Sequence, residues 1–200
     1  MTARFRNVFI LGTGRCGTVT AIQACKLITN YTAGHETRTG EIGPERLKYP
    51  AGHIEADNRL SWFLGRLDEG FGKDAYYVHL KRDPEATARS FSQRYRRGII
   101  KAYRTGILWK LPRETNPSDV CRDYVETVHS NIDHFLRDKP NQLTVDLENL
   151  AEGFDRLWRE IGAEGDLDQA KAILQQTHNQ SEGIAQMINR KVRSVLWPKQ

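Results

Sequence analysis

The sequence predicts an α/β fold in which a mostly parallel central sheet is flanked by helices. A short apolar run, Val8–Leu11, ends in a glycine-rich turn and is followed by helical spacing over Val19–Ile28. A second apolar run, Tyr76–Leu80, precedes another helix-forming segment, Ala86–Tyr95. Strands that alternate with helices are typical of parallel sheets. A chain of 200 residues with 38% hydrophobic and 28% charged residues suits one globular domain spanning 1–200.

The first turn, Gly12–Thr18, has the features of an anion site. Backbone N–H groups converge where a strand, a tight turn and a helix start meet, and the helix dipole favours negative charge there. The alternative is a tight strand–helix connection that binds nothing. We expect a phosphate or a sulfate group at this turn.

More than one phosphate ligand fits the turn. Gly12, Gly14 and Gly17 match the dinucleotide pattern G-x-G-x-x-G, and Glu36 stands nineteen residues after Gly17, near the position of a ribose-binding acid. This interpretation predicts an NAD(P)-binding oxidoreductase. The spacing of Gly12 and Gly17 also fits a nucleoside-triphosphate P-loop, but Thr18 stands where that loop requires Lys.

A second segment carries another phosphate signature. Asp83 is placed to cap a helix that Pro84 opens, so Arg82 lies at the carboxyl end of the strand before it. Ser90 lies about two turns into that helix. An Arg fork and a hydroxyl suit a dianionic phosphate. The alternative is that Arg82 pairs with an acid and Ser90 is an ordinary surface residue.

Together, the stretch Arg15-Cys16-Gly17-Thr18 and the pair Arg82 and Ser90, eight residues apart, resemble motifs of the sulfotransferase family. The donor of that family is 3′-phosphoadenosine 5′-phosphosulfate (PAPS). Cys16 replaces the usual Ser, and Val19 replaces a second Thr. The resemblance implies a P-loop-like sulfotransferase fold, PAPS as the donor, 3′,5′-adenosine diphosphate (PAP) as the product, and no metal.

The same resemblance assigns roles to individual residues. Seven residues are expected to hold the phosphosulfate: Gly14, Arg15, Cys16, Gly17, Thr18, Val19 and Thr20. Arg82 and Ser90 are expected to hold the 3′-phosphate. Arg190, followed by Lys191, matches a late basic segment of the family, although the family's glycines are missing here.

The segment Ala33–Arg38 resembles the Gly-Glu-Glu-Thr-Arg stretch of protein-tyrosine sulfotransferases. The resemblance implies that Glu36 is the catalytic base and that Arg38 positions the reacting groups. His35 replaces the first Glu and could itself be the base, because its unperturbed pKa lies near neutrality. The alternative is a solvated polar turn without a catalytic role.

Later segments agree with this resemblance. Gln142–Leu150 looks like a late strand of the family, and a helix is expected over Phe154–Ile161, ended by Gly162. An apolar helix is also expected over Leu60–Leu67. His79, within a predicted strand, is expected to be a satisfied core histidine.

Two polar residues precede that apolar helix. Asp57 and Asn58 are expected either to cap the helix or to line the acceptor pocket.

The composition bounds the compartment and the chemistry. No stretch approaches the ~20 apolar residues of a membrane span. Three cysteines at unrelated spacings, Cys16, Cys25 and Cys121, give neither a disulfide framework nor a zinc pattern, so a cytoplasmic, reduced location is expected. Because Cys16 stands beside a helix start, its thiol pKa is expected to be lowered.

A basic stretch adds to the net charge of +5. Residues 94–113 contain seven cations and no acid, interleaved with Tyr95, Tyr103 and Trp109, and the longest loop is expected over Gly106–Pro117. A solvated helix face, a funnel for an anionic cofactor or acidic acceptor, and a non-enzymatic nucleotide- or nucleic-acid-binding module all fit this stretch. With the sulfotransferase interpretation we expect a small-molecule, glycan or peptide acceptor and no nucleic acid, and the oligomeric state stays open.

Overall fold

A computed structural model describes residues 3–175 of the chain. Five strands form one sheet in the order β2-β3-β1-β4-β5, and every neighbouring pair is parallel. The strands are β1 (Asn7–Leu11), β2 (Thr32–His35), β3 (His53–Ala56), β4 (Tyr76–Lys81) and β5 (Gln142–Asp146). The predicted α/β class with a parallel sheet is therefore confirmed. Because all strands run the same way, their carboxyl ends meet at one edge of the sheet.

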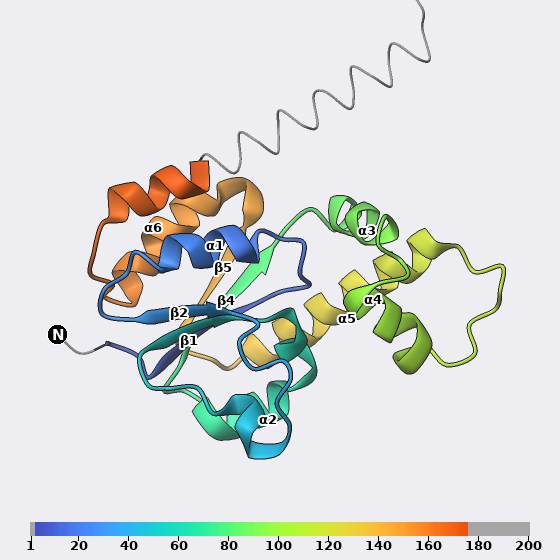
Figure 1. Ribbon diagram of the computed structural model, residues 1–200, viewed down its shortest axis with the longest axis horizontal. Helices are drawn as coiled ribbons and strands as arrows, with labels where there is room; N and C mark the ends of the chain where they lie inside the picture. Colours follow the sequence, from blue (N-terminus) through green and yellow to red (C-terminus); the bar gives the residue numbers. More distant parts are fainter. Residues whose placement is uncertain (1–2, 176–200) are drawn as a thin grey trace, which may run out of the picture.

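Helices cover both faces of this sheet (Figure 1). The labelled α-helices are α1 (Thr18–Cys25), α2 (Leu64–Phe71), α3 (Pro84–Ser92), α4 (Gly98–Ala102), α5 (Pro117–Leu136) and α6 (Leu150–Glu160), and residues 167–175 are also helical. Residues of α1 and α6 bury one face of the sheet, and residues of α2, α3 and α5 bury the other. No helix within residues 3–175 is long and apolar enough to cross a membrane.

The strand order separates this sheet from a dinucleotide-binding fold. In that fold the second strand lies beside the first, so the acid at its end reaches the ribose. Here β3 lies between β1 and β2. Glu36, which directly follows β2, is thereby displaced from β1 by two strand spacings, about 10 Å. The ribose role for Glu36 has no geometric support.

The segment after β3 differs from the expected helix Leu60–Leu67. Asp57 accepts a hydrogen bond from the backbone N–H of Arg59 at 2.8 Å and so starts a 3₁₀ turn, Asn58–Trp62. The backbone of Phe63 then leaves the helical region, and α2 begins only at Leu64. The predicted helix is wrong in its first part because the Asp57 cap selects the tighter turn.

The other predicted helices are placed nearly as expected. Asp83 caps α3 by accepting a hydrogen bond from the N–H of Ala86 at 2.7 Å, and Pro84 occupies the first turn. Helix α3 ends at Ser92, earlier than predicted. Gly162, with φ of +62°, follows the end of α6 as predicted. A π-helical turn, Tyr103–Ile107, occupies the start of the expected loop.

Candidate functional site

The turn between β1 and α1 has a conformation that few residues can adopt. Gly14, Arg15 and Gly17 all have positive φ, at +78°, +62° and +89°. A side chain at Gly17 would bring its Cβ to 2.5 Å from Leu147, and one at Gly14 would come to 2.9 Å from Asn58. Both positions therefore require glycine, and the left-handed Arg15 is a strained conformation of the kind found at ligand sites.

Helix α1 begins directly after this turn. Gly17 occupies its N-cap position, and no side chain of the described residues caps the helix there. The first turn of α1 contains no acid. The first backbone N–H groups, which belong to Thr18, Val19 and Thr20, therefore lack intrahelical partners and favour an anion.

Two segments far apart in the sequence meet at Arg15. The Arg15 Nε donates a hydrogen bond to Ser90 Oγ at 3.0 Å. The Arg82 Nη1 donates to the backbone carbonyl of Arg15 at 3.2 Å. Burial lowers the pKa of the Arg15 guanidinium, and the nearby charges of Arg94 and Arg82 lower it further. Three cations and a hydroxyl therefore gather at the turn, which is a strongly electropositive site.

Cys16 does not behave as its place in the turn suggested. Its side chain is fully buried. Burial raises the pKa of the thiol to about 11, and hydrogen bonds around the sulfur lower it by less. The predicted lowering of this pKa is wrong, because desolvation outweighs the helix start. Cys16 is a packing residue behind the turn.

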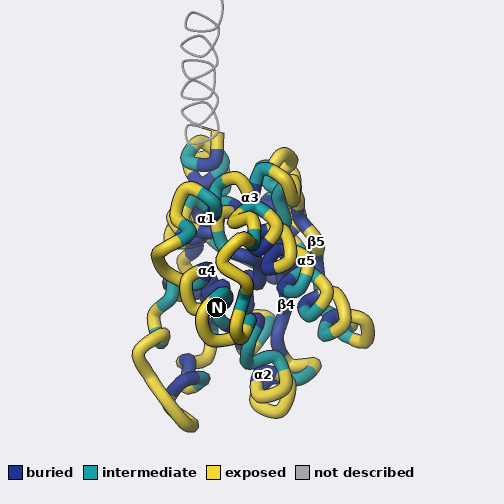
Figure 2. Tube along the Cα trace, turned by 90° about the vertical axis from the view of Figure 1, so that its right-hand side faces the viewer, coloured by how far each residue is buried: buried dark blue, intermediate teal, exposed yellow. Residues whose placement is uncertain are grey.

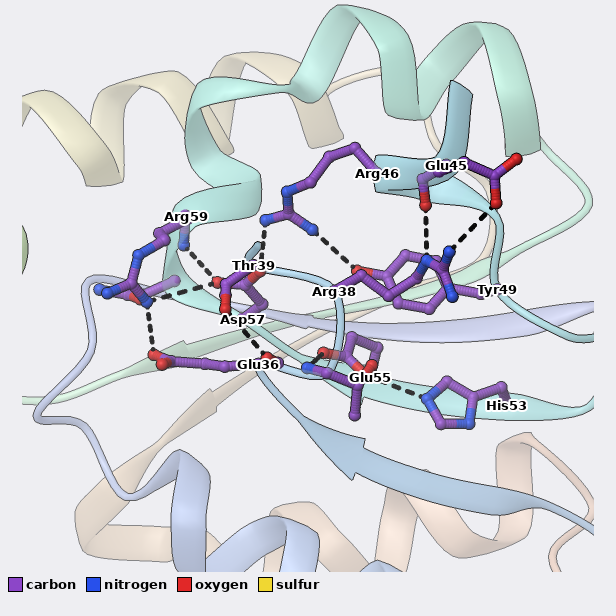
Figure 3. A network of polar contacts seen from close by, with 12 residues as sticks. Glu36, Arg38, Thr39, Glu45, Arg46, Tyr49, His53, Glu55, Asp57 and Arg59 are labelled. Carbon is purple, nitrogen blue, oxygen red and sulfur yellow. Dashed lines mark hydrogen bonds and ion pairs between the residues drawn. The ribbon is translucent and has the colours of Figure 1, made fainter. Parts of the chain in front are cut away.

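The two candidate bases stand at the end of β2, His35 as its last residue and Glu36 directly after it, and they face different partners. His35 Nε2 lies 3.1 Å from Thr18 Oγ1, at the start of α1. Glu36, at a φ of +54°, places its carboxylate 2.9 Å from the Arg59 guanidinium. Figure 3 shows the Glu36 carboxylate reaching across to Arg59. The structure thus brings His35 to the turn and fixes Glu36 by an ion pair.

Arg38 is directed elsewhere. It donates to the backbone carbonyl of Glu45 at 2.5 Å and lies 3.5 Å from the Glu45 carboxylate (Figure 3). None of the contacts that Arg38 makes within residues 3–175 reaches the turn of residues 12–17.

Arg59 and Asn58, after β3, are site residues that the sequence did not assign to catalysis. Arg59 pairs with Glu36, and Asn58 Nδ2 donates to the carbonyl of Thr13 at 3.3 Å. This segment therefore contacts both the base candidate and the anion turn. An acidic residue directly after a strand, here Asp57 after β3, could have revealed this segment. The sequence did not identify β3 as a strand, so this signal was missed.

A polar network surrounds this segment (Figure 3). Asp57 is fully buried and lies 2.5 Å from the Arg46 guanidinium. Glu55, also fully buried, accepts hydrogen bonds from the N–H and the hydroxyl of Thr37, both at 2.7 Å, and lies 3.0 Å from His53 Nε2. These carboxylates are already partnered. Within residues 3–175 no group of three or more His, Cys, Asp or Glu side chains could hold a metal ion.

A groove of about 1130 Å³ opens beside Arg82, between the end of β4 and α5. Basic residues and acidic residues such as Glu126 and Asp133 line this groove together. No residue of the anion turn, Gly12–Thr18, is part of the lining. We therefore do not place the anion there. Next to it, the fully buried His79 contacts Asp133 at 3.0 Å and His129 at 2.9 Å, so the prediction of a satisfied core histidine is confirmed.

The remaining predicted contacts lie at the chain end. Arg190 and Lys191 fall outside the described residues. The structure therefore gives no account of them.

Two solved structures with a similar fold are sulfotransferases. A sulfotransferase domain from the curacin biosynthetic pathway matches with a TM-score of 0.57 and 13% identity, over 80% of this chain and 74% of that domain. The mouse sulfotransferase SULT7A1, solved with PAP, matches with a TM-score of 0.59 and 12% identity. The fold is that of the sulfotransferases. The fold implied by the sequence resemblance is thus confirmed.

The match to the mouse enzyme covers 88% of this chain and 66% of that enzyme. No protein-family model and no curated protein matches the sequence. The likeness therefore establishes the fold, and the activity must be argued from the site.

Proposed function

We propose that this protein transfers a sulfuryl group from PAPS to a hydroxyl acceptor. The observation that carries the proposal is the meeting of Arg82 and Ser90 with Arg15 at the anion turn. Arg82 and Ser90 lie 67 and 75 residues after Arg15 in the sequence, and their contacts join the two candidate phosphate-binding motifs in one site. A donor that carries both a 5′-phosphosulfate and a 3′-phosphate needs two such motifs side by side.

The residues of the turn fit the phosphosulfate. Gly14, Arg15 and Gly17 have positive φ angles, and left-handed residues are a common component of anion-binding turns. The Arg15 guanidinium adds charge, and the start of α1 adds further N–H donors. Arg82 and Ser90 would hold the 3′-phosphate, because a guanidinium fork and a hydroxyl supply several donors to one dianion. The bound PAP of SULT7A1 supports this choice of donor.

Transfer forms a bond between sulfur and the acceptor oxygen and breaks the bond between sulfur and the 5′-phosphate oxygen, whose electron pair leaves with PAP. The acceptor proton must pass to a base. We assign this role to Glu36, whose carboxylate can accept a proton and is held in place by Arg59. Arg15 would stabilise the charge that develops on the transferring group.

His35 is the competing base. The His35 ring contacts Thr18 at the proposed phosphosulfate turn, whereas the Glu36 carboxylate contacts Arg59. In the Glu36 mechanism His35 orients the Thr18 hydroxyl. In the alternative it takes the proton itself.

Calorimetry with PAP tests the donor site. We expect PAP to bind and 5′-AMP to bind far more weakly. Arg82→Ala should weaken PAP at least ~30-fold, about 2 kcal/mol, because a charge-assisted contact to the 3′-phosphate is lost. The same substitution should change 5′-AMP affinity less than about threefold.

Arg89→Ala is the matched control, since Arg89 lies seven residues later on α3, is mostly exposed and pairs only loosely with Asp83 at 3.9 Å. Absence of PAP binding, or equal binding of 5′-AMP, would overturn the 3′-phosphate assignment.

Transfer from labelled PAPS to a panel of hydroxyl acceptors tests the base. Glu36→Gln should keep PAP affinity and abolish transfer, whereas His35→Asn should retain part of the transfer. The reverse order of effects would make His35 the base.

A further inference from the structure

The basic segment, residues 94–113, holds cations that form no ion pair within residues 3–175. Its seven members are Arg94, Arg96, Arg97, Lys101, Arg104, Lys110 and Arg113. None of them forms an ion pair with a carboxylate of residues 3–175. All except Arg104 are exposed. Unpaired like charges repel one another, so the fold gains no electrostatic stabilisation from keeping them together.

The segment also exposes one large ring. Trp109 is 77% exposed and Ile107 is 55% exposed. Tyr103 is buried instead, and the ring of Tyr95 is covered by the Arg104 guanidinium at 4.8 Å. Next to Trp109, Lys110 has a φ of +59°, and the π-helical turn ends at Ile107. Both irregularities are of the kind found at binding sites.

Contacts attach this segment to the anion turn. Tyr103 packs edge-on against Tyr124 with ring centroids 5.3 Å apart, and Tyr124 donates a hydrogen bond to the carbonyl of Thr13 at 2.7 Å. The charge of Arg94 also acts on Arg15 itself. In Figure 2 much of the tube around α4 has the colour of exposed residues. Tyr103 and Arg94 therefore attach the basic segment to the proposed site, while its exposed cations face solvent.

We propose that the basic segment binds the sulfuryl acceptor and that the acceptor is an acidic glycan. This inference rests on the proposed function, which requires a hydroxyl. A carboxylated oligosaccharide offers a negative charge and free hydroxyls on each sugar, so charge on the segment would hold one sugar while a neighbouring hydroxyl reaches the turn. The apolar face of a sugar ring can stack on the indole of Trp109.

The aromatic residues argue against a nucleic acid. Single-stranded nucleic acids are held by several exposed rings on which successive bases stack. Within residues 94–113 only Trp109 is exposed in this way, because Tyr103 is buried and Tyr95 is covered. DNA also lacks a free hydroxyl along its backbone. An acidic peptide carries hydroxyls at few positions and gains less from a ring that stands alone.

Direct binding of oligogalacturonate, a hexamer with a carboxylate on every sugar, tests the surface without any transfer assay. We expect binding that weakens with salt, and none to maltohexaose, which has the same length and no charge. Lys101→Glu/Lys110→Glu should weaken binding at least tenfold at low salt. Lys26→Glu/Lys73→Glu reverses the charge of two exposed lysines outside the segment and should change it less than twofold.

The ring is tested separately. Trp109→Ala should weaken oligogalacturonate at least fivefold, and Trp109→Phe should restore part of the affinity. Absence of binding by the wild-type chain, or an equal loss in the Lys26/Lys73 variant, would overturn the proposal. Tighter binding of an oligonucleotide or of poly-glutamate with the same Trp109 dependence would overturn the glycan assignment. Calorimetry with PAP on the same samples shows whether the donor site is intact. A loss of glycan binding with PAP binding retained can then be assigned to the basic segment.

Discussion

The polar network of residues 32–59 and the basic segment of residues 94–113 treat charge in opposite ways. In the network, buried carboxylates each have a cation or several donors: Asp57 has Arg46, and Glu55 has His53 and Thr37. In the basic segment no cation has a carboxylate among the described residues. One region uses its charges inside the fold, and the other presents them to solvent.

The difference separates positioning from recognition. A buried charge is retained only with a partner, and the pair then fixes the backbone on both sides of it. The network accordingly fixes the turns that carry Glu36 and Arg59. Exposed, unpaired cations fix nothing, and they contribute free energy only when an anion arrives.

The largest effect is expected where a buried pair is broken. Asp57→Asn keeps the shape of the side chain but leaves the Arg46 guanidinium buried without its counter-charge. We expect the free energy of unfolding to fall by about 3–5 kcal/mol, as is typical of a broken buried ion pair. Urea unfolding followed by circular dichroism measures it.

Glu45→Gln is the control for this loss. Glu45 is half exposed and pairs with Arg38 and Lys48 at the surface, where such pairs contribute at most about 1 kcal/mol. If both substitutions cost the same, burial does not distinguish the network.

The next prediction concerns His79, which is fully buried and, unlike the carboxylates of the network, uncharged at pH 7. Burial and then the neighbouring His129 lower the pKa of His79 to about 4, while Asp133 opposes this and Lys81 adds to it. In the unfolded chain the His79 imidazole has its ordinary pKa of about 6.5. Between about pH 6.5 and 4 this ring is therefore protonated in the unfolded state and neutral in the folded state. Stability should therefore be lost as the pH falls through this range, on the order of 2 kcal/mol.

Urea midpoints at pH 7 and pH 4.5 measure this loss. His79→Asn should lower stability at pH 7 and flatten the pH dependence. An unchanged slope in that variant would assign the acid sensitivity to other groups, including the carboxylates of the network.

How much the sequence predicted depends on the kind of signal. The two strand–turn–helix segments that carry Arg15 and Arg82 were predicted from local chemistry, and the family resemblance linked them; that they meet depends on the pairing of β1 with β4, which the structure supplies. The cap at Asp83 followed from local chemistry alone. Both signals act over a few residues.

The contacts of Arg59 could not be predicted in this way. They depend on β3, a strand whose His53 and Glu55 break the apolar pattern that identifies buried strands. These polar residues are buried because Thr32 and Thr37, on and just after a neighbouring strand, supply their hydrogen bonds. For Cys16 the helix start was visible in the sequence, but the burial that outweighs it was not.

The smallest effect is expected in the basic segment, and it sharpens the comparison. Lys101→Gln should change the free energy of unfolding by less than about 0.5 kcal/mol, because Lys101 is exposed and has no ion pair in the described chain. Lys139→Gln is the counterpart: its ammonium lies 2.8 Å from Asp68 and over the ring of Phe135, and its side chain is largely buried. That substitution should cost about 1 kcal/mol. Equal costs in urea unfolding would mean that the fold itself uses the basic segment, and the case for an external anion would lose its basis.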